Sequence, residues 1–418
     1  MLGAFLTLVT WVGLGQLVAL LVSPLLARLY DPGAFGVFSI FTAVAGILAS
    51  FATGRYDQAL LLEEQDSRAA DLLTLATRVC MATCLSLWLL LWLLRPLLLS
   101  RFSVDPAVAY WLPLTPALTF GVAMLFALNA WFNRTRSYRL IAGSKAFQSV
   151  FGHLVMVTLG FAGWGAAGLV WGTIAGYLGA ILWMGLLVRR AVLPYRPTAQ
   201  ALRQAARDHR DFPLYSAPAN LIQFLCSYSI LFGTMFFYSA EWIGLFALAQ
   251  RVTVAPLILV RDSIVQVFSR ELTLRPVHRR SALYLKTLGL SVLVFSGLAL
   301  PIVLFGPKLF ALVFGSRWET AGMLARNLAP WLISSMSVNA VLYIFAASGR
   351  NRDVLIWQIA YLGGTGAMLY RLSSLGLPEL LLYLSAYSAV MYSILAVMGL
   401  GVLGGPVKSP PPEEIPEP

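Results

Sequence analysis

Long apolar stretches recur along the whole chain, and only short polar segments separate them. About 20 consecutive apolar residues are needed for a helix to cross ~30 Å of hydrocarbon, and each stretch reaches that length. We predict twelve spans, at residues 3–27, 34–54, 72–94, 107–131, 140–162, 164–188, 214–238, 242–268, 284–305, 322–347, 354–371 and 378–403. The pattern therefore predicts an all-α polytopic membrane protein.

Composition supports this prediction. The 418 residues are 59% hydrophobic and 11% charged, with a mean hydropathy of +0.77, whereas soluble domains carry roughly 25% charged residues. The longest polar connection runs from Arg189 to Pro213, which leaves no room for a soluble domain. Met1 is followed by an apolar run without a basic leader, so we expect the first segment to be retained as a helix.

The basic residues are distributed unequally between the two sides of the predicted membrane. Connections after even-numbered spans, together with the tail, hold 21 of the 30 Lys and Arg residues, and connections after odd-numbered spans hold seven. Cytoplasmic loops carry the excess of Lys and Arg. Both termini are therefore predicted to lie in the cytoplasm, and the net charge of +12 mostly reflects topology.

Two segments of the chain resemble each other at a constant offset. Tyr30, Gly36 and Phe38 recur 208 residues later as Tyr238, Gly244 and Phe246. We predict two six-helix lobes, residues 1–188 and 214–405, related by a pseudo-twofold axis along the membrane normal. The segment 189–213 is the predicted cytoplasmic linker, and the proline-rich, acidic segment 406–418 is a predicted disordered tail.

The eighth predicted span contains charges that are unfavourable in lipid. An Arg or Asp at the bilayer centre costs about 2.5–3.5 kcal/mol, yet the span includes Arg251, Arg261 and Asp262. At 100° per residue, Asp262 lies close to the face of Arg251, with Arg261 and Gln266 at its flanks. One interpretation is a cationic, water-filled cavity that binds an anionic head group, because guanidinium groups suit phosphate oxygens.

Other interpretations remain open for these residues. The charges can form an interlobe ion pair, or Arg261 and Asp262 can reach the cytoplasmic interface by snorkelling. Pro256 lacks a backbone donor and should bend the helix, which makes it a candidate hinge.

Polar residues in other spans extend the candidate site. Arg55 ends the second span in the run from Thr53 to Gln58, which either faces the same cavity or anchors the helix at the interface. Four uncharged residues inside spans are candidate sugar contacts or helix-helix hydrogen-bonding groups. They are Gln16, Asn129, Gln223 and Asn339.

Several function classes lack support in the sequence. The three His and three Cys residues show no metal-ligand spacing, and no glycine-rich phosphate loop follows a strand. The basic residues are dispersed among short loops, which is unlike a nucleic-acid-binding surface. We expect no cofactor, no metal, no nucleic-acid partner and no enzymatic activity.

The motifs resemble those of Wzx-type polysaccharide-biosynthesis flippases of the multidrug/oligosaccharidyl-lipid/polysaccharide exporter (MOP) superfamily. The resemblance rests on RDFPLYSAP at 210–218, GLFALAQRV at 244–252, SPLLARLYDP at 23–32 and Gly54-Arg55-Tyr56. It covers spans one to three and seven to nine well. Two features depart from the family pattern: Arg261-Asp262 stands where small or uncharged residues are expected, and the chain has almost no basic leader.

The resemblance implies a function and a location. Members of this family move undecaprenyl-diphosphate-linked oligosaccharide from the inner to the outer leaflet of the bacterial inner membrane by alternating access, for O-antigen, capsule or exopolysaccharide synthesis. Arg251 and Arg55 match family motifs and are the carried-over candidates for diphosphate binding. Implied partners are the lipid-linked oligosaccharide, the bilayer, the polysaccharide polymerase and chain-length machinery, and a coupling ion.

Two alternative functions stay open at this point. A cation-coupled multidrug exporter of the same superfamily would normally carry acidic residues in its cavity, and none lies deep in spans one to seven. A membrane glycosyltransferase or polymerase would be favoured by acidic motifs in an outer loop or by one very large outer loop. Neither feature is present.

Overall fold

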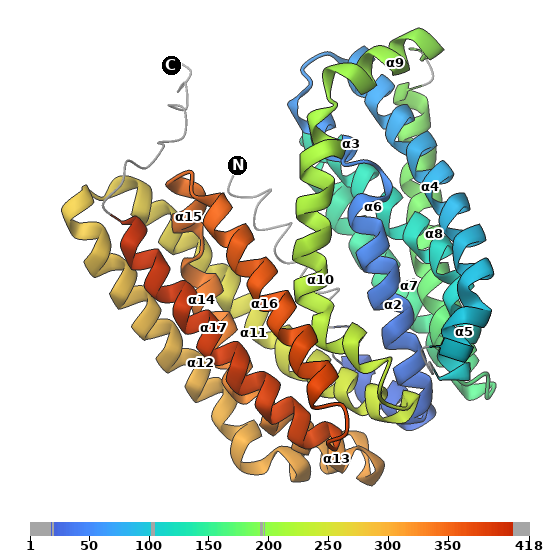
Figure 1. Cartoon of the computed structure of the whole chain (residues 1–418). Coiled ribbons are helices and arrows are strands. Elements are labelled where there is room, and N and C mark those ends of the chain that lie inside the picture. Colours follow the sequence, from blue (N-terminus) through green and yellow to red (C-terminus); the bar gives the residue numbers. More distant parts are fainter. Residues whose placement is uncertain (1–17, 19–20, 102–104, 193–194, 196, 404–418) are drawn as a thin grey trace. The chain divides into compact units, whose positions relative to one another are not determined.

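The computed structural model describes residues 18, 21–101, 105–192, 195 and 197–403 (Figure 1). Every regular element among these residues is a helix. The longer helices are α2 (Pro32–Ala52), α4 (Asp66–Arg101), α6 (Thr115–Arg134), α7 (Tyr138–Phe161), α8 (Ala166–Val192), α10 (Ala217–Thr234), α11 (Ala240–Leu274), α12 (Val277–Phe314), α14 (Ala329–Val341), α16 (Asn351–Arg371) and α17 (Leu377–Val402). The shorter ones are α3 (Tyr56–Ala59), α5 (Pro106–Trp111), α9 (Ala199–Asp208), α13 (Glu319–Asn327) and α15 (Tyr343–Ala347).

The all-α polytopic fold is confirmed. Nine helical segments among the described residues are long and apolar enough to cross a membrane. The helices α10 and α16 occupy two further predicted spans. The first predicted span lies almost entirely outside the described residues, as does the predicted tail at 406–418.

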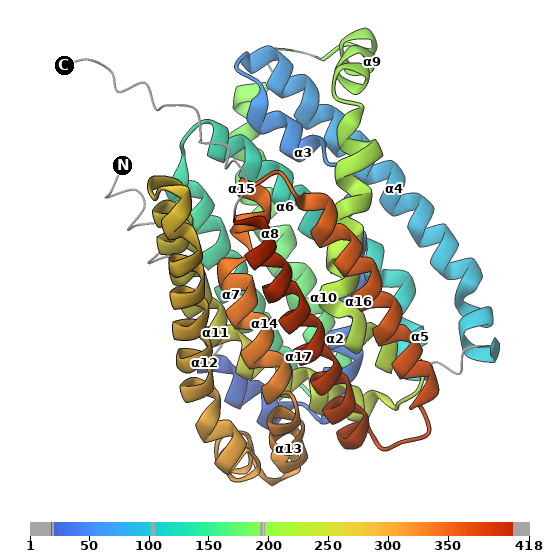
Figure 2. The same ribbon diagram turned by 60° about the vertical axis from the view of Figure 1, so that its left-hand side comes forward.

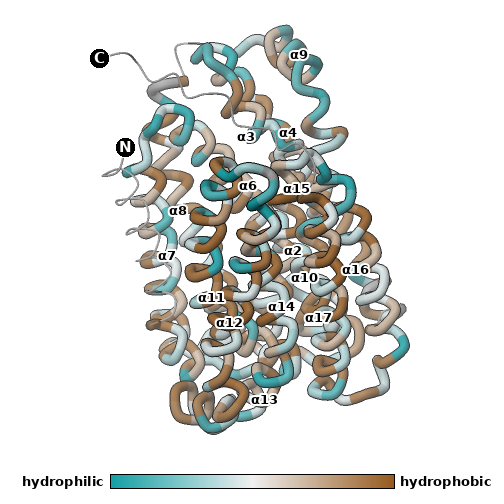
Figure 3. Tube along the Cα trace, turned by 90° about the vertical axis from the view of Figure 1, so that its left-hand side faces the viewer, coloured by the Kyte–Doolittle hydropathy of each residue, from teal (hydrophilic) through white to brown (hydrophobic). Residues whose placement is uncertain are grey.

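Exposed apolar surfaces are consistent with a lipid surrounding. In α4 the side chains of Leu85, Trp88 and Trp92 are exposed, and Leu293 and Leu312 are exposed in α12. Such large exposed apolar surfaces mark membrane or protein contacts. Hydrophobic positions recur along the long helices in Figure 3, whereas hydrophilic positions are frequent around α9 and in several connections.

The chain divides into two compact units, residues 1–247 and 248–418, and α11 belongs to both. The predicted division into lobes 1–188 and 214–405 with a linker between them stays a prediction. In the first unit, α6 packs against α2, α4 and α8, and α7 packs along α8. In the second unit, α12 packs against α13 and α14, and α17 contacts α14 and α16.

A close helix crossing within the first unit brings the two repeated motifs together. A Cβ placed on Gly36 would lie 1.8 Å from the carbonyl oxygen of Ala240, and one on Gly244 would lie 1.7 Å from that of Pro32. Pro32 and Ala240 differ by the same 208 residues as the two glycines. The starts of α2 and α11 therefore meet in a contact with local twofold character, as in an isologous interface.

The starts of these two helices are capped by carboxylates. The Asp31 side chain accepts a 2.7 Å hydrogen bond from the backbone N–H of Ala34, with Pro32 at the first helical position. Asp105 accepts hydrogen bonds from the backbone N–H groups of Ala107 and Ala240, at 2.9 and 3.0 Å. Caps of this type satisfy orphan donors and favour the helix start.

The predicted linker contains α9, which packs against α4 within the first unit (Figures 1 and 2). Thr198 caps α9 by accepting from the N–H of Ala201, and Leu202 is buried. Next to the C-terminal end of α9, His209 Nε2 lies 2.9 Å from a carboxylate oxygen of Glu63. Arg134 donates to the carbonyl oxygens of Glu63 and Glu64 and to the carboxylate of Asp66. The connection before α4 is thus fixed to α6 and to the linker.

Candidate functional site

A turn at the end of α2 holds Arg55 in an unusual backbone conformation. Gly54 and Arg55 have φ angles of 62° and 61°, and the left-handed region costs a residue with a side chain roughly 1 kcal/mol or more. Such strain persists where the surroundings impose it, often at functional sites. The turn joins α2 to α3 and places the Asp57 carboxylate near the guanidinium group of Arg55.

The Arg55 side chain is buried but incompletely paired. Arg55 is 9% exposed and Asp57 is 6% exposed. The nearest pair of charged atoms, Arg55 Nη1 and Asp57 Oδ2, is 3.8 Å apart, which is too long for a hydrogen bond. Arg55 Nε is buried and has no partner among the described residues, so this guanidinium keeps unused donors.

Thr53 completes the polar cluster around Arg55 and Asp57. The Thr53 hydroxyl donates to Asp57 Oδ1 and accepts from the backbone N–H of Arg55, the latter at 3.3 Å. Burial raises the pKa of the Tyr56 phenol above its ordinary value. The hydroxyl of Thr53 holds the Asp57 carboxylate by one oxygen and thereby orients it.

The charges of α11 fall into two different environments. Arg261 Nε and Nη2 both donate to Asp262 Oδ1, at 2.9 and 2.7 Å. These adjacent residues therefore neutralise each other. Asp262 lies eleven residues after Arg251, a rise of about 16 Å along a helix, so it does not neutralise Arg251.

Arg251 has no carboxylate partner among the described residues. None of the six ion pairs in the part of the chain that the structure describes includes it. The side chain is half-buried on a helix that is continuous from Ala240 to Leu274. An unpaired guanidinium at this depth is available for an anion, because burial without a counter-charge is unfavourable.

The remaining candidates differ in how far their polar groups are already used. Asn129 Oδ1 is buried without a partner among the described residues. The Asn339 amide donates to the carbonyl oxygen of Ser335 at 2.8 Å, within its own helix. Gln223 and Gln266 are exposed, and Gln16 lies outside the described residues. Asn129 is therefore the best supported sugar-contact candidate.

Pro256 lies inside α11, which continues as a helix past it, and Pro256 is exposed. Its role as a hinge stays a prediction.

The sequence analysis did not predict the contacts among Arg55, Asp57 and Thr53. It included the run from Thr53 to Gln58 as a candidate but did not pair Asp57 or Thr53 with Arg55, although the Thr-Gly-Arg-Tyr-Asp order places both within two residues of Arg55. The signal was Gly54, since glycine before a charged residue allows the left-handed turn that brings Asp57 back.

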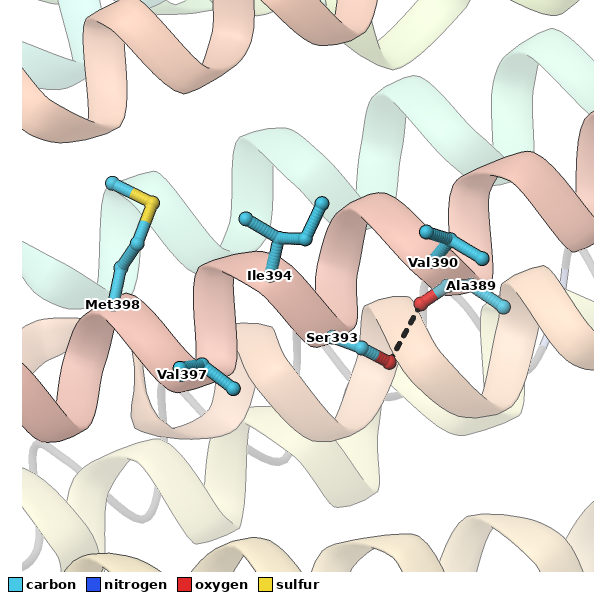
Figure 4. Close-up of a pocket in the computed structure, with 6 residues that line it drawn as sticks. All are labelled: Ala389, Val390, Ser393, Ile394, Val397 and Met398. Atoms are coloured by element: carbon cyan, nitrogen blue, oxygen red, sulfur yellow. Dashed lines mark hydrogen bonds between the residues drawn. The ribbon is translucent and has the colours of Figure 1, made fainter.

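One depression in the surface of the second unit is apolar and unlike the predicted cationic site. It measures about 550 Å³ and is lined by Ala389, Val390, Ser393, Ile394, Val397 and Met398, all from α17 (Figure 4). The Ser393 hydroxyl donates to the carbonyl oxygen of Ala389 at 2.8 Å. The Ser393 hydroxyl is therefore already used within the helix. None of the six lining residues is charged, so this depression offers no charged group to a ligand.

Comparison with known proteins identifies related sequences and folds. Residues 25–322 match the model of a family described as polysaccharide biosynthesis protein. No curated protein sequence matches the chain.

Several solved transporters have a similar fold. Lipid II flippase MurJ in an inward closed conformation is 12% identical with a TM-score of 0.71, over 96% of this chain and 87% of that one. A multidrug resistance MATE family transporter of the MOP superfamily, inward-facing, is 16% identical with a TM-score of 0.60, over 94% and 95%. A MOP superfamily transporter from Pyrococcus furiosus, described as having a binding pocket of reverse polarity, is 14% identical with a TM-score of 0.58, over 96% of both chains. At these identities the likeness shows the fold alone.

Proposed function

Because the chain belongs to the polysaccharide biosynthesis protein family and has the fold of MOP superfamily transporters, we propose that it is a flippase for a lipid-linked oligosaccharide. Its substrate is an undecaprenyl-diphosphate-linked glycan, which it moves from the inner to the outer leaflet of the bacterial inner membrane. The product serves synthesis of O-antigen, capsule or exopolysaccharide. The uneven distribution of Lys and Arg supports cytoplasmic termini.

The unpaired guanidinium of Arg251 is the observation that carries this proposal. A diphosphate supplies several anionic oxygens, and hydrogen bonds between charged groups contribute about 1.5–3 kcal/mol each. Arg55 supplies a second guanidinium with unused donors. We expect Arg251 to bind the diphosphate, while the polyprenyl chain stays in lipid, and Arg55 stays a second predicted binding residue.

Binding of the diphosphate can also drive the change between the inward-open and outward-open conformations. A ligand shifts a conformational equilibrium only through its different affinities for the two states. A hundredfold difference in affinity corresponds to about 2.7 kcal/mol, which one or two charge-assisted contacts can supply. In this proposal the loaded arginines favour reorientation, and release of the diphosphate on the outer side allows return.

Translocation by the purified protein in vesicles tests the function. We expect the full-length protein to move a fluorescent undecaprenyl-diphosphate oligosaccharide between leaflets at least tenfold faster than protein-free vesicles. The label becomes accessible to an impermeant quencher as it crosses. A matched lipid with the same glycan on a neutral polyprenol should not be accelerated.

The same vesicles distinguish the alternative, a cation-coupled multidrug exporter. The likeness of the fold to a multidrug transporter and the buried carboxylate of Asp57 favour testing it. Export of a cationic dye driven by a sodium or proton gradient, with no translocation of the lipid-linked glycan, would support the exporter and contradict the flippase.

A further inference from the structure

The turn between α11 and α12 carries a concentration of positive charge. Arg270, Arg275, Arg279, Arg280 and Lys286 lie within 17 residues, and Glu271 is the only acidic residue among them. Glu271 is already engaged, because its carboxylate lies 3.1 Å from Arg275 Nη2. The turn therefore has a strong excess of positive charge. This charge is additional to Arg251 and Arg261, which lie farther towards the start of α11.

Arg280 is the unusual member of this group. It is only 9% exposed, whereas Arg275 and Arg279 are exposed. Its Nε donates to the carbonyl oxygen of Arg275 at 3.2 Å, which holds the guanidinium group against the turn. Its Nη1 is buried and has no partner among the described residues. An unpaired buried donor of a charged group is unfavourable, so the position favours an anionic ligand.

The first turn of α12 adds backbone donors at the same place. Pro276 is the residue before the helix, no side chain caps this end, and its first turn contains no acidic residue. The first N–H groups of a helix lack internal partners and favour anions, especially phosphate. Since Arg280 bonds to the carbonyl of Arg275, its guanidinium lies beside this uncapped helix start.

The surroundings favour a lipid phosphate over a free one. Leu274, in the last position of α11, is 70% exposed, and Leu285 and Leu290 of α12 are also exposed apolar side chains. Acyl chains can lie along this apolar surface while the phosphate contacts the turn. The uneven charge distribution assigns the turn to the cytoplasmic side, where anionic lipids attract basic segments.

We propose that the α11–α12 turn binds the phosphate of an anionic phospholipid through Arg280, the backbone donors at the start of α12, and the flexible side chains of Arg275 and Arg279. The site is separate from the diphosphate-binding arginines of the proposed function and does not depend on that function. Its ligand is a lipid of the surrounding membrane, and its occupation stabilises the start of α12.

Lipid retention by the full-length protein tests the site. Purified protein is mixed with phosphatidylglycerol or with a phosphatidylcholine of the same acyl chains, and bound lipid is counted by native mass spectrometry. We expect wild-type protein to retain phosphatidylglycerol at least tenfold more tightly than phosphatidylcholine. Arg280→Gln should reduce this preference severalfold or more. The control Arg352→Gln removes one exposed positive charge from the start of α16, on the same predicted side, and should leave the preference intact.

A second variant and a competition with inorganic phosphate complete the test. Arg279→Gln changes an exposed side chain and should weaken phosphatidylglycerol retention several-fold, which keeps the test valid if Arg280→Gln fails to fold. Inorganic phosphate at millimolar concentration is the probe for a free anion, and displacement of the lipid by it would overturn the assignment to a lipid. Equal retention by the Arg280, Arg279 and Arg352 variants would overturn the site itself.

Discussion

Replacing Gly244 by valine is expected to prevent accumulation of folded protein. A Cβ at this position would lie 1.7 Å from the carbonyl oxygen of Pro32, and ordinary contacts begin at 3.4 Å. The contacting atom belongs to backbone, so no side chain can rotate away. The helices would have to separate, at a cost at or above the ~1–3 kcal/mol of ordinary overpacking. Gly36→Val should act in the same way, because its Cβ meets the carbonyl of Ala240.

The measurement is the yield and thermal midpoint of monodisperse protein in detergent. Gly289→Val is the matched control, since Gly289 is also helical and nothing lies within 4 Å of a Cβ placed there. A Gly244→Val protein with the yield and midpoint of the Gly289→Val protein would show that the crossing is not this close.

Arg251→Gln is expected to slow translocation of the lipid-linked glycan roughly tenfold to hundredfold, because about 1.5–3 kcal/mol of charge-assisted hydrogen bonding is lost. Arg251→Lys should retain part of the rate, since it keeps the charge but loses the planar fork. Translocation in the vesicle assay is the measurement. Arg317→Gln, which removes an exposed charge outside the spans, serves as the control for net charge.

Arg261→Gln should have a smaller effect than Arg251→Gln. The Asp262 carboxylate already accepts both hydrogen bonds of Arg261, so this guanidinium has fewer donors for a substrate. Equal rates for the Arg251 and Arg317 variants would remove Arg251 from the binding site.

The sequence was sufficient to predict the helical spans because lipid imposes one length and one composition on each. The predicted span at 34–54 corresponds to α2, which begins at Pro32 after the Asp31 cap. Agreement is poorer where polar turns extend a helix beyond the hydrocarbon. The span predicted at 72–94 belongs to α4, which runs from Asp66 to Arg101, since hydropathy does not register its polar first turn.

Helix breaks were harder to predict than helices. The span predicted at 322–347 is divided into α13, α14 and α15. Pro330 lies in the first turn of α14, where its missing N–H is not needed. A hydropathy window averages over such a break, because it measures composition and not backbone hydrogen bonding.

The charged residues of the candidate site could be identified from the sequence. Their ion-pair partners could not. The sequence identifies Arg251 and Arg261 as unfavourable in lipid and Arg55 as a charged residue at the end of a span. Which of them keeps free donors depends on local geometry: the left-handed turn at Gly54 and Arg55 brings Asp57 within 3.8 Å of Arg55. The rotamer of Arg261 directs it to Asp262. Periodicity alone grouped Asp262 with Arg251 and could not distinguish these partners.

The sequence repeat was also only partly informative about the structure. The 208-residue offset relates Gly36 to Gly244, yet spacing does not reveal that these residues meet. Their contact follows from the absence of a Cβ on both helices, which permits backbone atoms to approach.

Binding of the diphosphate by the arginines inside the membrane is most directly tested by affinity measurements on the purified protein. Wild-type protein is predicted to bind an undecaprenyl-diphosphate oligosaccharide at least tenfold more tightly than the corresponding monophosphate. A protein with both Arg55→Gln and Arg251→Gln is predicted to bind the two lipids with equal, weaker affinity. A double variant that keeps the wild-type preference for the diphosphate would contradict the account.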